Sequence, residues 1–324
     1  MKRVARSLLF ASTAAVLVAT VGVGSVAAAN LPAEDTMYGL SCPQENNPFV
    51  VNAMQLWAID ATTAAGTSVG DGSGDVEGTC AGQPAWNPVT RKAYAFALTD
   101  EHDEPSVLME IDLATGESTP VADMYYEGEP VQVASLAIGL DGAAYALAYT
   151  QLYSVDLTTG ALKAIGGEIP VSYGFAVDPT TGKFWALAAS SSLLEIDVAT
   201  GGYTFGQSLE LPGAYSLQID SAGGLWVFTA NVDDDPILRT ELWTASFGAT
   251  QPSTAVGVVS VAGSGEPFSQ ALLIVPALPP GGIEPSAPAP ALAATGLHPA
   301  AGLVVAGVLL LTLGAVLVSR RRPA

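Results

Sequence analysis

The chain is poor in basic residues, in histidine and in cysteine. It has 11 lysines and arginines against 31 aspartates and glutamates, and two residues each of histidine and cysteine. A strongly acidic surface repels nucleic-acid phosphates and anionic lipid headgroups, so neither is an expected partner. His102 and His298 do not form the motif of a zinc site. We therefore expect a protein that is not an enzyme and that has no cofactor.

Two long apolar runs stand at the ends of the chain. At the N-terminus, three basic residues precede the run 8–26, and three alanines follow at 27–29. A charged segment, an apolar segment and small residues in this order are typical of a secretory signal peptide. We expect residues 1–29 to be removed on export and residues 30–35 to lead into the mature domain.

The C-terminal run has a short polar peptide in front of it and arginines behind it. The peptide consists of Leu292, Ala293, Ala294, Thr295 and Gly296. The apolar run 300–318 is close to the length of a membrane-spanning helix, and the arginines at 320–322 would stay in the cytoplasm. This order resembles the cell-wall sorting signal of Gram-positive surface proteins, in the LAXTG form of actinobacteria.

The resemblance implies a covalent attachment to the cell wall. A sortase thiol would attack the carbonyl of Thr295, Gly296 would leave, and Thr295 would become amide-linked to peptidoglycan. Sortase and peptidoglycan are then the expected partners, and the protein is secreted and wall-anchored. Before sorting, the chain would touch the membrane only through residues 297–324. The alternative is a single-pass membrane protein with its ectodomain outside the cell.

Charge is more extreme in the mature segment than in the whole chain. Six of the 11 basic residues lie in the two terminal segments, so five bases remain beside all 31 acids and the net charge is −26. Cations, basic proteins and neutral glycans remain open as ligands, although a high net charge also serves solubility alone.

A repeat between the two signals predicts the fold. Five short apolar stretches of one pattern recur at Leu56–Asp60, Leu108–Asp112, Leu152–Asp156, Leu194–Asp197 and Leu242–Ser246. Their spacing of 41 to 52 residues is that of propeller blades. Three copies continue into an Asp-x-x-x-Gly turn that ends at Gly116, Gly160 or Gly201. Glycine accepts a positive φ there, and the aspartate can bind backbone N–H groups, as in a tight hairpin.

A second, interleaved repeat supplies the other half of each blade. Its clearest copy runs from Phe175 to Leu187, and two hairpins per period make a four-stranded blade. We predict an all-β, five-bladed propeller over residues 36–276, closed by strands from both ends of the domain. The alternative is six blades. The domain resembles secreted propellers with YVTN-like or WD-type repeats. Residues 277–291, rich in proline and alanine, are expected to form a linker to the wall.

The two cysteines are expected to pair. In the proposed order of strands, Cys42 and Cys80 fall on one face of the ring, between neighbouring blades. Export exposes both thiols to oxidation, which favours a Cys42–Cys80 disulfide over two free thiols.

A ligand site is expected where the chain enters the innermost strands. Alignment of the repeats places Tyr173, Tyr215 and Phe268 at equivalent positions, with Tyr125 and Tyr126 able to overhang them. Aromatic rings beside carboxylates suit sugars or cationic peptides. The alternative for these rings is packing between blades.

The acidic loops could bind calcium through oxygen ligands. Asn231, Asp233 and Asp235 begin like a calcium loop, but Pro236 and Leu242 depart from its pattern, so the candidate is weak. We expect a wall-anchored propeller that binds or displays at the bacterial surface, its ligand an extracellular glycan or protein. The alternative function is a carboxylate-based hydrolase or lyase acting on glycans or phosphoesters in the propeller funnel.

Overall fold

A computed structural model describes most of the central part of the chain. The described residues are 32–33, 35–41, 55–70, 80–98, 104–211, 213–230, 239–248, 253–261 and 269–276. The chain divides into two compact units, 1–277 and 278–324, and every described residue belongs to the first. The predicted signal peptide, linker, sorting peptide and C-terminal helix lie outside the described residues. Within the described ranges, no helix is long and apolar enough to cross a membrane.

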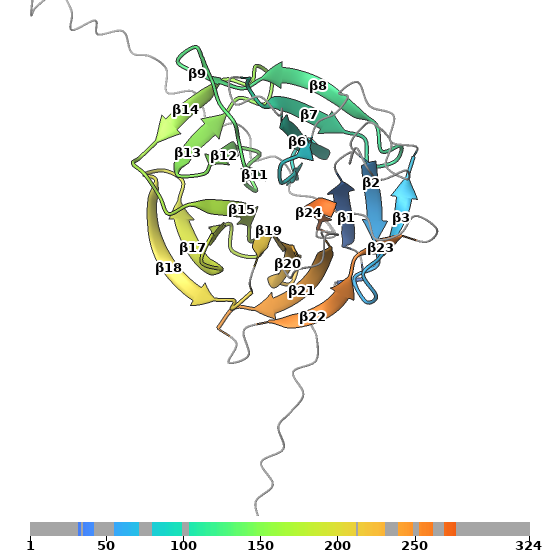
Figure 1. Cartoon of the computed structure of the whole chain (residues 1–324). Helices are drawn as coiled ribbons and strands as arrows, with labels where there is room; N and C mark the ends of the chain where they lie inside the picture. The colour runs from blue at the N-terminus through green and yellow to red at the C-terminus, as the bar shows by residue number, and fades with distance from the viewer. Residues whose placement is uncertain are drawn as a thin grey trace, which may run out of the picture. The chain divides into compact units, whose positions relative to one another are not determined.

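The described strands form five blades around one axis (Figure 1). Blade 1 comprises β1 (Thr36–Ser41), β2 (Gln55–Ile59) and β3 (Ala65–Val69). Blade 2 comprises β4 (Cys80–Ala81), β5 (Ala85–Asn87), β6 (Lys92–Leu98), β7 (Val107–Ile111) and β8 (Ser118–Asp123). Blade 3 comprises β11 (Ser135–Ile138), β12 (Ala144–Ala148), β13 (Gln151–Val155) and β14 (Leu162–Ile165).

The remaining blades follow in chain order. Blade 4 comprises β15 (Ser172–Val177), β16 (Phe184–Ala188), β17 (Ser192–Asp197) and β18 (Gly202–Ser208). Blade 5 comprises β19 (Ala214–Ile219), β20 (Gly224–Ala230), β21 (Thr240–Ser246) and β22 (Thr254–Val258). A small hairpin, β9 (Tyr125–Tyr126) and β10 (Glu129–Pro130), lies between blades 2 and 3 in the chain.

The two ends of the domain close the ring, as the repeats predict. The last strand, β24 (Ser269–Val275), pairs antiparallel with β1 and becomes the innermost strand of blade 1. A short strand, β23 (Ser260–Val261), pairs in parallel with β3 at the outer edge of that blade. The innermost strands then contact one another around the axis in the order β24, β5, β11, β15, β19 and back to β24. The ring is therefore complete with five blades, and no sixth is needed.

The core consists of five hydrophobic clusters, each between two neighbouring blades. The cluster between blades 4 and 5, for example, includes Leu193, Leu217 and Val227, all fully buried. The other clusters join blades 1 and 2, 2 and 3, 3 and 4, and 5 and 1. Alternating side chains of each strand supply the two faces that pack in this way. Burial between blades holds the ring together.

The predicted Asp-x-x-x-Gly turns are present at the outer hairpins. The carboxylates of Asp112 and Asp156 each accept a backbone N–H at 2.8 Å, and that of Asp197 accepts one at 3.0 Å. Gly116, Gly160 and Gly201 have φ values of +75°, +69° and +73°. The aspartate therefore fixes the start of each turn, and the glycine permits its end.

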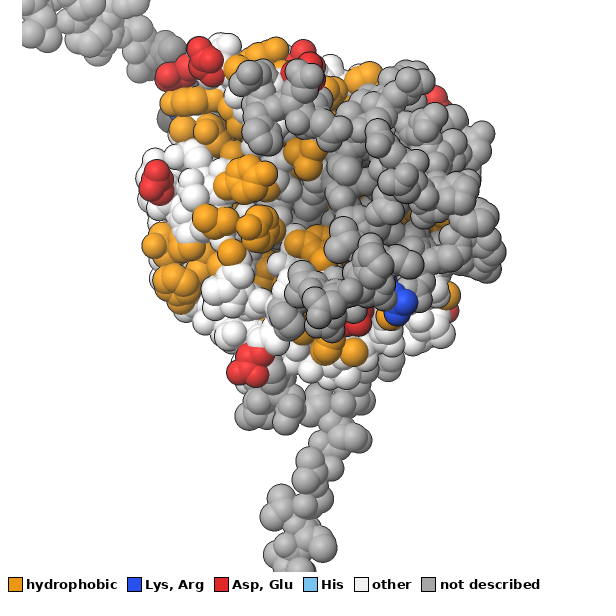
Figure 2. Space-filling view, viewed as in Figure 1, with side chains coloured by type: hydrophobic (Ala, Val, Ile, Leu, Met, Phe, Trp, Pro, Cys, Tyr) orange, Lys and Arg blue, Asp and Glu red, His pale blue; other side chains and the backbone are white. Residues whose placement is uncertain are grey.

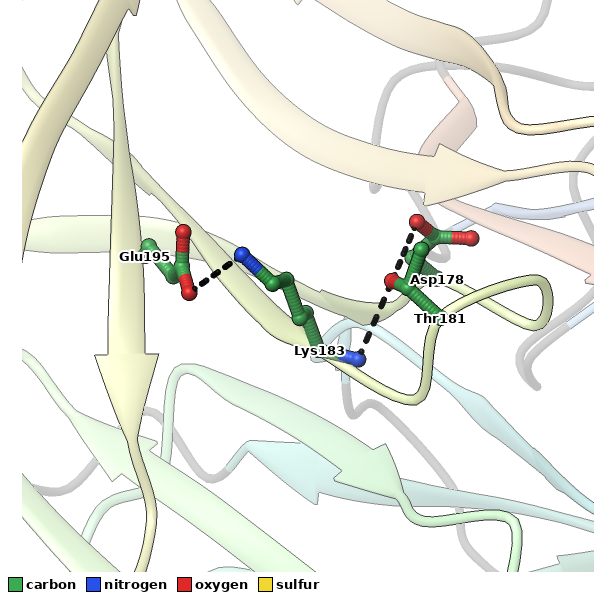
Figure 3. A network of polar contacts seen from close by, with 4 residues as sticks. All are labelled: Asp178, Thr181, Lys183 and Glu195. Carbon is green, nitrogen blue, oxygen red and sulfur yellow. Dashed lines mark hydrogen bonds and ion pairs between the residues drawn. The ribbon is translucent and has the colours of Figure 1, made fainter.

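The inner hairpin of blade 4 uses the same chemistry (Figure 3). Asp178 accepts hydrogen bonds from Thr180 and Thr181, and the Lys183 N–H donates to the Thr181 hydroxyl oxygen at 3.4 Å. Lys183 also pairs with Glu195 on β17 at 2.8 Å. Both charged side chains are exposed, so this ion pair adds little stability.

The turn glycines also carry contacts between blades. A Cβ atom on Gly116 would lie 2.1 Å from the carbonyl oxygen of Val69, the last residue of β3. One on Gly160 would lie 2.4 Å from the carbonyl oxygen of Asp123, the last residue of β8. The outer strand of one blade thus ends against the turn of the next, where only glycine leaves room.

One glutamine fills the centre of the ring. The side chain of Gln83, from the segment between β4 and β5, is 3% exposed. Its Nε2 donates to the carbonyl oxygens of Phe175 and Leu217 at 2.6 and 2.7 Å. Its Oε1 accepts the N–H groups of the same two residues at 3.3 and 3.0 Å. These backbone groups lie on the inner edges of β15 and β19, which have no further strand to pair with. The amide of Gln83 takes the place of a peptide group there.

Small residues occupy equivalent positions on the innermost strands of the other four blades. They are Ser135 in blade 3, Gly174 in blade 4, Ser216 in blade 5 and Ala271 in blade 1. Backbone bonds extend the connection to blade 3, since the Gln83 N–H donates to Ala134 and the Gln83 carbonyl oxygen accepts from Leu136. Ser216 in turn accepts the N–H of Leu272 in β24 at 3.0 Å. All five blades are therefore joined at the axis.

Candidate functional site

The connections at one end of the blades differ in length. In blade 3, Tyr149 and Thr150 alone join β12 to β13, and in blade 4 residues 189–191 join β16 to β17. The equivalent connections of blades 1, 2 and 5 are longer and lie largely outside the described residues. The described surface at this end therefore lies over blades 3 and 4.

Three apolar side chains are exposed at this end of blades 3 and 4, and we call them the mouth patch. Tyr149 is 47% exposed, Val171 40% and Tyr173 38%. Backbone bonds hold them together, because the Ser172 N–H donates to Tyr149 at 3.0 Å and the Ala189 N–H donates to Val171 at 2.8 Å. Figure 2 shows hydrophobic side chains gathered over these two blades.

Tyr173 reaches the surface because of a β-bulge. In the pairing of β15 with β16, Ser172 lies opposite Ala188 and Gly174 lies opposite Leu187, so Tyr173 has no partner. Bulges of this kind redirect a side chain out of the regular alternation. The backbone of Tyr149 is also unusual, with a φ of +54°. Two exposed tyrosines of the mouth patch thus lie on short, hydrogen-bonded segments.

The mouth patch suits ligands with flat or cationic groups. Tyrosine rings stack on the apolar faces of sugars and attract cations through their π-electrons, and their hydroxyl groups can donate or accept hydrogen bonds. Sequence alignment anticipates Tyr173 in this role. Tyr149 and Val171 are recognised only from the structure, since their proximity to Tyr173 depends on the link between blades 3 and 4.

Tyr215, predicted to share the site, packs between blades 5 and 1. It is also a bulged residue, since Ala214 lies opposite Thr229 and Ser216 opposite Phe228. Its ring, however, packs against the cluster that contains Trp57 and Trp226. Its hydroxyl lies 3.1 Å from the Thr240 hydroxyl, and burial raises its pKa. Tyr215 therefore packs between two blades, which is the alternative to a role in the ligand site.

The strand register revises the predicted position of Phe268. In the pairing of β24 with β1, Ser269 lies opposite Ser41 and Ala271 opposite Leu40, so Gln270 is the bulged residue. Gln270, and not Phe268, is therefore the equivalent of Tyr173. Phe268 itself lies outside the described residues. The sequence alignment was displaced by two residues because an apolar pattern does not reveal a bulge.

Tyr125 and Tyr126 do not overhang the mouth patch. They form β9, and Tyr125 makes a parallel bridge with Ala161 beside the outer hairpin of blade 3. The Tyr126 ring lies edge-on to that of Tyr153, with centroids 5.4 Å apart. The charge of Glu127 raises the pKa of Tyr126. The expectation for this pair was wrong, because the outer strand β8 delivers the chain to the rim of blade 3.

The other predicted site residues lie outside the described ranges. They are Cys42, Asn231, Asp233, Asp235 and the sorting peptide Leu292, Ala293, Ala294, Thr295 and Gly296. Cys80 begins β4, where it pairs with Leu98. Within the described part of the chain, no three acidic, histidine or cysteine side chains are placed to hold a metal ion.

Comparison with known proteins adds similarities of fold only. No family model and no curated protein sequence matches the chain. Among solved structures, a chain of a nidogen/laminin complex is 8% identical, with a TM-score of 0.48 over 75% of this chain and 98% of that one. TolB from Acinetobacter baumannii is 14% identical, with a TM-score of 0.47 over 76% of this chain and 68% of that one. A protein of unknown function from Bacteroides caccae is 10% identical, with a TM-score of 0.44 over 74% and 99% of the two chains. The assignment as a propeller therefore rests on the sheet topology.

Proposed function

We propose that the chain is exported, is joined to peptidoglycan through Thr295 by a sortase, and binds or displays at the bacterial surface through its propeller. The observation that carries the proposal is the order of the C-terminal segments: a LAATG peptide, an apolar run at 300–318 and arginines at 320–322. An apolar helix followed by arginines would halt the chain in the membrane, with Thr295 just outside it.

The propeller is suited to display because its ring closes on itself, through the pairing of β1 with β24. Residues 277–291, which follow, contain five prolines and would hold the domain at a short distance from the wall.

Binding is assigned to the mouth patch. Tyr149, Val171 and Tyr173 are the large hydrophobic side chains exposed beside the short connections of blades 3 and 4. A net charge of −26 for residues 30–295 favours neutral or cationic ligands over anionic ones. Glycans and basic peptides of the wall and its surroundings are the ligand classes that fit both properties.

The described centre of the ring offers no support for carboxylate chemistry. The axis is filled by Gln83, and the facing positions are Ser135, Gly174, Ser216 and Ala271. A glycosidase or lyase would need acidic side chains there. Binding is therefore the better candidate for the described residues.

Cell fractionation tests the anchoring step. The wild-type chain, expressed in an actinobacterial host, should stay in the wall fraction after boiling in detergent and should be released by muramidase. Thr295→Ala should move the chain to the membrane fraction or the medium, because the sorting peptide loses the threonine side chain by which a sortase would recognise it. Ser286→Ala, a similar change in the linker, should behave as wild type. Detergent extraction of the wild-type chain would contradict the proposal.

A further inference from the structure

The outer strand of blade 4 is more exposed than its four counterparts. Six of the seven residues of β18 are exposed and one is half-buried, whereas β3, β8, β14 and β22 each have at most three exposed residues. Phe205 is 66% exposed, which is the highest value among the large hydrophobic residues described, and Tyr203 is 40% exposed. The two rings meet edge to face, with centroids 5.7 Å apart. The outer edge of blade 4 thus carries an aromatic pair on one face of the strand.

The same face is covered in blade 3. Leu162 pairs with Val155, and Ala164 with Tyr153, as Tyr203 pairs with Ile196 and Phe205 with Leu194. Leu162 is only 8% exposed, since it belongs to a cluster that Val121 of β8 and Tyr126 of β9 complete.

No such cover exists over β18 among the described residues. The chain passes from β14 to β15 through residues 166–171 without a hairpin. The one large apolar residue of that link that is buried, Ile169, joins the cluster between blades 3 and 4. The aromatic face of β18 is therefore apolar and exposed, and no described segment covers it as β8 and β9 cover blade 3.

Charge identifies the kind of partner. The strand Gly202–Ser208 has no charged residue and no proline, the two features that usually protect an edge strand from pairing. Glu195, which pairs with Thr204, is neutralised by Lys183 at 2.8 Å. Asp197, at the end of β17, is held in its turn by Thr200. In a chain with 31 acids against 11 bases, a neutral strip is a surface on which two copies can approach.

We propose that β18 is the interface of a homodimer. Two copies of one strand that pair edge to edge in antiparallel fashion are related by a two-fold axis, so the strip is complementary to itself. Tyr203 and Phe205 of each copy pack against those of the other, and the outer main-chain edges of the two strands, which no described strand pairs with, form hydrogen bonds. The contact is apolar while the copies repel one another through their net charge, so added salt strengthens the dimer.

Sedimentation equilibrium of the full chain in density-matched detergent tests this interface. The wild-type chain should dimerise reversibly, and more tightly in about 0.5 M than in about 0.05 M sodium chloride, because salt shortens the Debye length. Phe205→Lys should weaken dimerisation at least about ten-fold, since it removes the most exposed anchor and brings like charges together. Val89→Lys, a matched change at a residue 46% exposed in a turn of blade 2, should leave the dimer unchanged.

Several outcomes would overturn the proposal. A wild-type chain that stays monomeric at about 100 µM would do so, as would a dimer that survives Phe205→Lys. Tyr203→Glu provides a second variant on the same face. Circular dichroism and thermal melting identify a variant that fails to fold, and the other variant then decides. A dimer that weakens with salt would show that ionic contacts hold it and would refute β18 as its interface.

Discussion

Gln83 and Leu217 lie 134 residues apart in the chain and exchange two hydrogen bonds at the axis of the ring. The Gln83 amide donates to the Leu217 carbonyl oxygen at 2.7 Å and accepts the Leu217 N–H at 3.0 Å. The same amide makes the equivalent pair with Phe175. One side chain thus satisfies backbone groups of two blades that would otherwise be buried without partners.

Replacing this glutamine should destabilise the whole domain. Gln83→Leu keeps most of the volume but leaves the inner backbone groups of Phe175 and Leu217 unpaired, at a cost of about 1–3 kcal/mol for each group left unsatisfied. Gln207→Leu is the control, because Gln207 also joins two blades, through Ser246, but is only half-buried. Urea unfolding followed by fluorescence should show a loss at least twice as large for Gln83. Equal losses would mean that the axis has no special role.

Alanine substitutions at two turn glycines allow the cost of backbone strain to be measured apart from the cost of a clash between blades. Gly116 and Gly182 have similar φ values of +75° and +72°. A Cβ atom would lie 2.1 Å from the Val69 oxygen at Gly116, whereas the nearest atom at Gly182 is 3.7 Å away. Gly182→Ala should cost about 1 kcal/mol from strain alone. Gly116→Ala should cost clearly more, because the neighbouring blade must move. Thermal melts of the two variants test this order, and a reversed order would disprove the docking role.

The acid stability of the domain should depend on Asp178. Partial burial by itself raises the pKa of this carboxyl, but the hydrogen bonds from Thr181 and Thr180 outweigh burial and lower the pKa below its ordinary value of 3.8. A lowered pKa in the folded state contributes stability that is present above the unfolded value and is lost as the pH falls through the folded value. Asp178→Asn keeps an acceptor oxygen but loses the charge.

A pH series of unfolding experiments measures this contribution. The difference in unfolding free energy between the wild type and Asp178→Asn should be constant from about pH 7 to pH 5 and should shrink below about pH 4. The comparison with the variant cancels the general repulsion among the other acids, which changes with pH in both proteins. A difference that does not vary with pH would show that the Asp178 charge has no effect on folding.

Ligand binding should depend on the mouth patch. With purified peptidoglycan sacculi as the probe, Tyr173→Ala and Tyr149→Ala should each reduce retention of the propeller about ten-fold, the effect of losing one stacked ring. Val89→Ala, an exposed apolar residue away from the patch, should retain wild-type binding. Sacculi that do not retain the wild type would exclude the wall glycan as ligand, and unchanged retention in both tyrosine variants would place binding elsewhere.

The sequence repeats predict most of the fold. Each copy holds a strand and its turn within a few consecutive residues, so local chemistry such as that of Asp156 and Gly160 is legible in the sequence, and the five-bladed ring with its closure is confirmed. Contacts across the ring are not local. Nothing in the segment around Gln83 indicates that its side chain reaches β15 and β19.

The candidate site was predictable only in part, for the same reason. Tyr173 follows from the alignment, but the bulges that expose it and that place Gln270 at the equivalent position are features of strand pairing. Tyr125 was misplaced because its neighbours in space, around Ala161, come from the next blade. The exposed face of Phe205 could not be predicted either, since it depends on whether a hairpin such as β9–β10 covers the outer strand, and no described hairpin covers β18.

Mass spectrometry of muramidase-released wall fragments tests the proposed function most directly. We predict a chain that begins near Asn30 and ends at Thr295, with a peptidoglycan stem peptide amide-linked to the threonine carbonyl. A chain recovered intact through Ala324 in the membrane fraction would contradict it, and the ectodomain would then belong to a membrane-tethered protein.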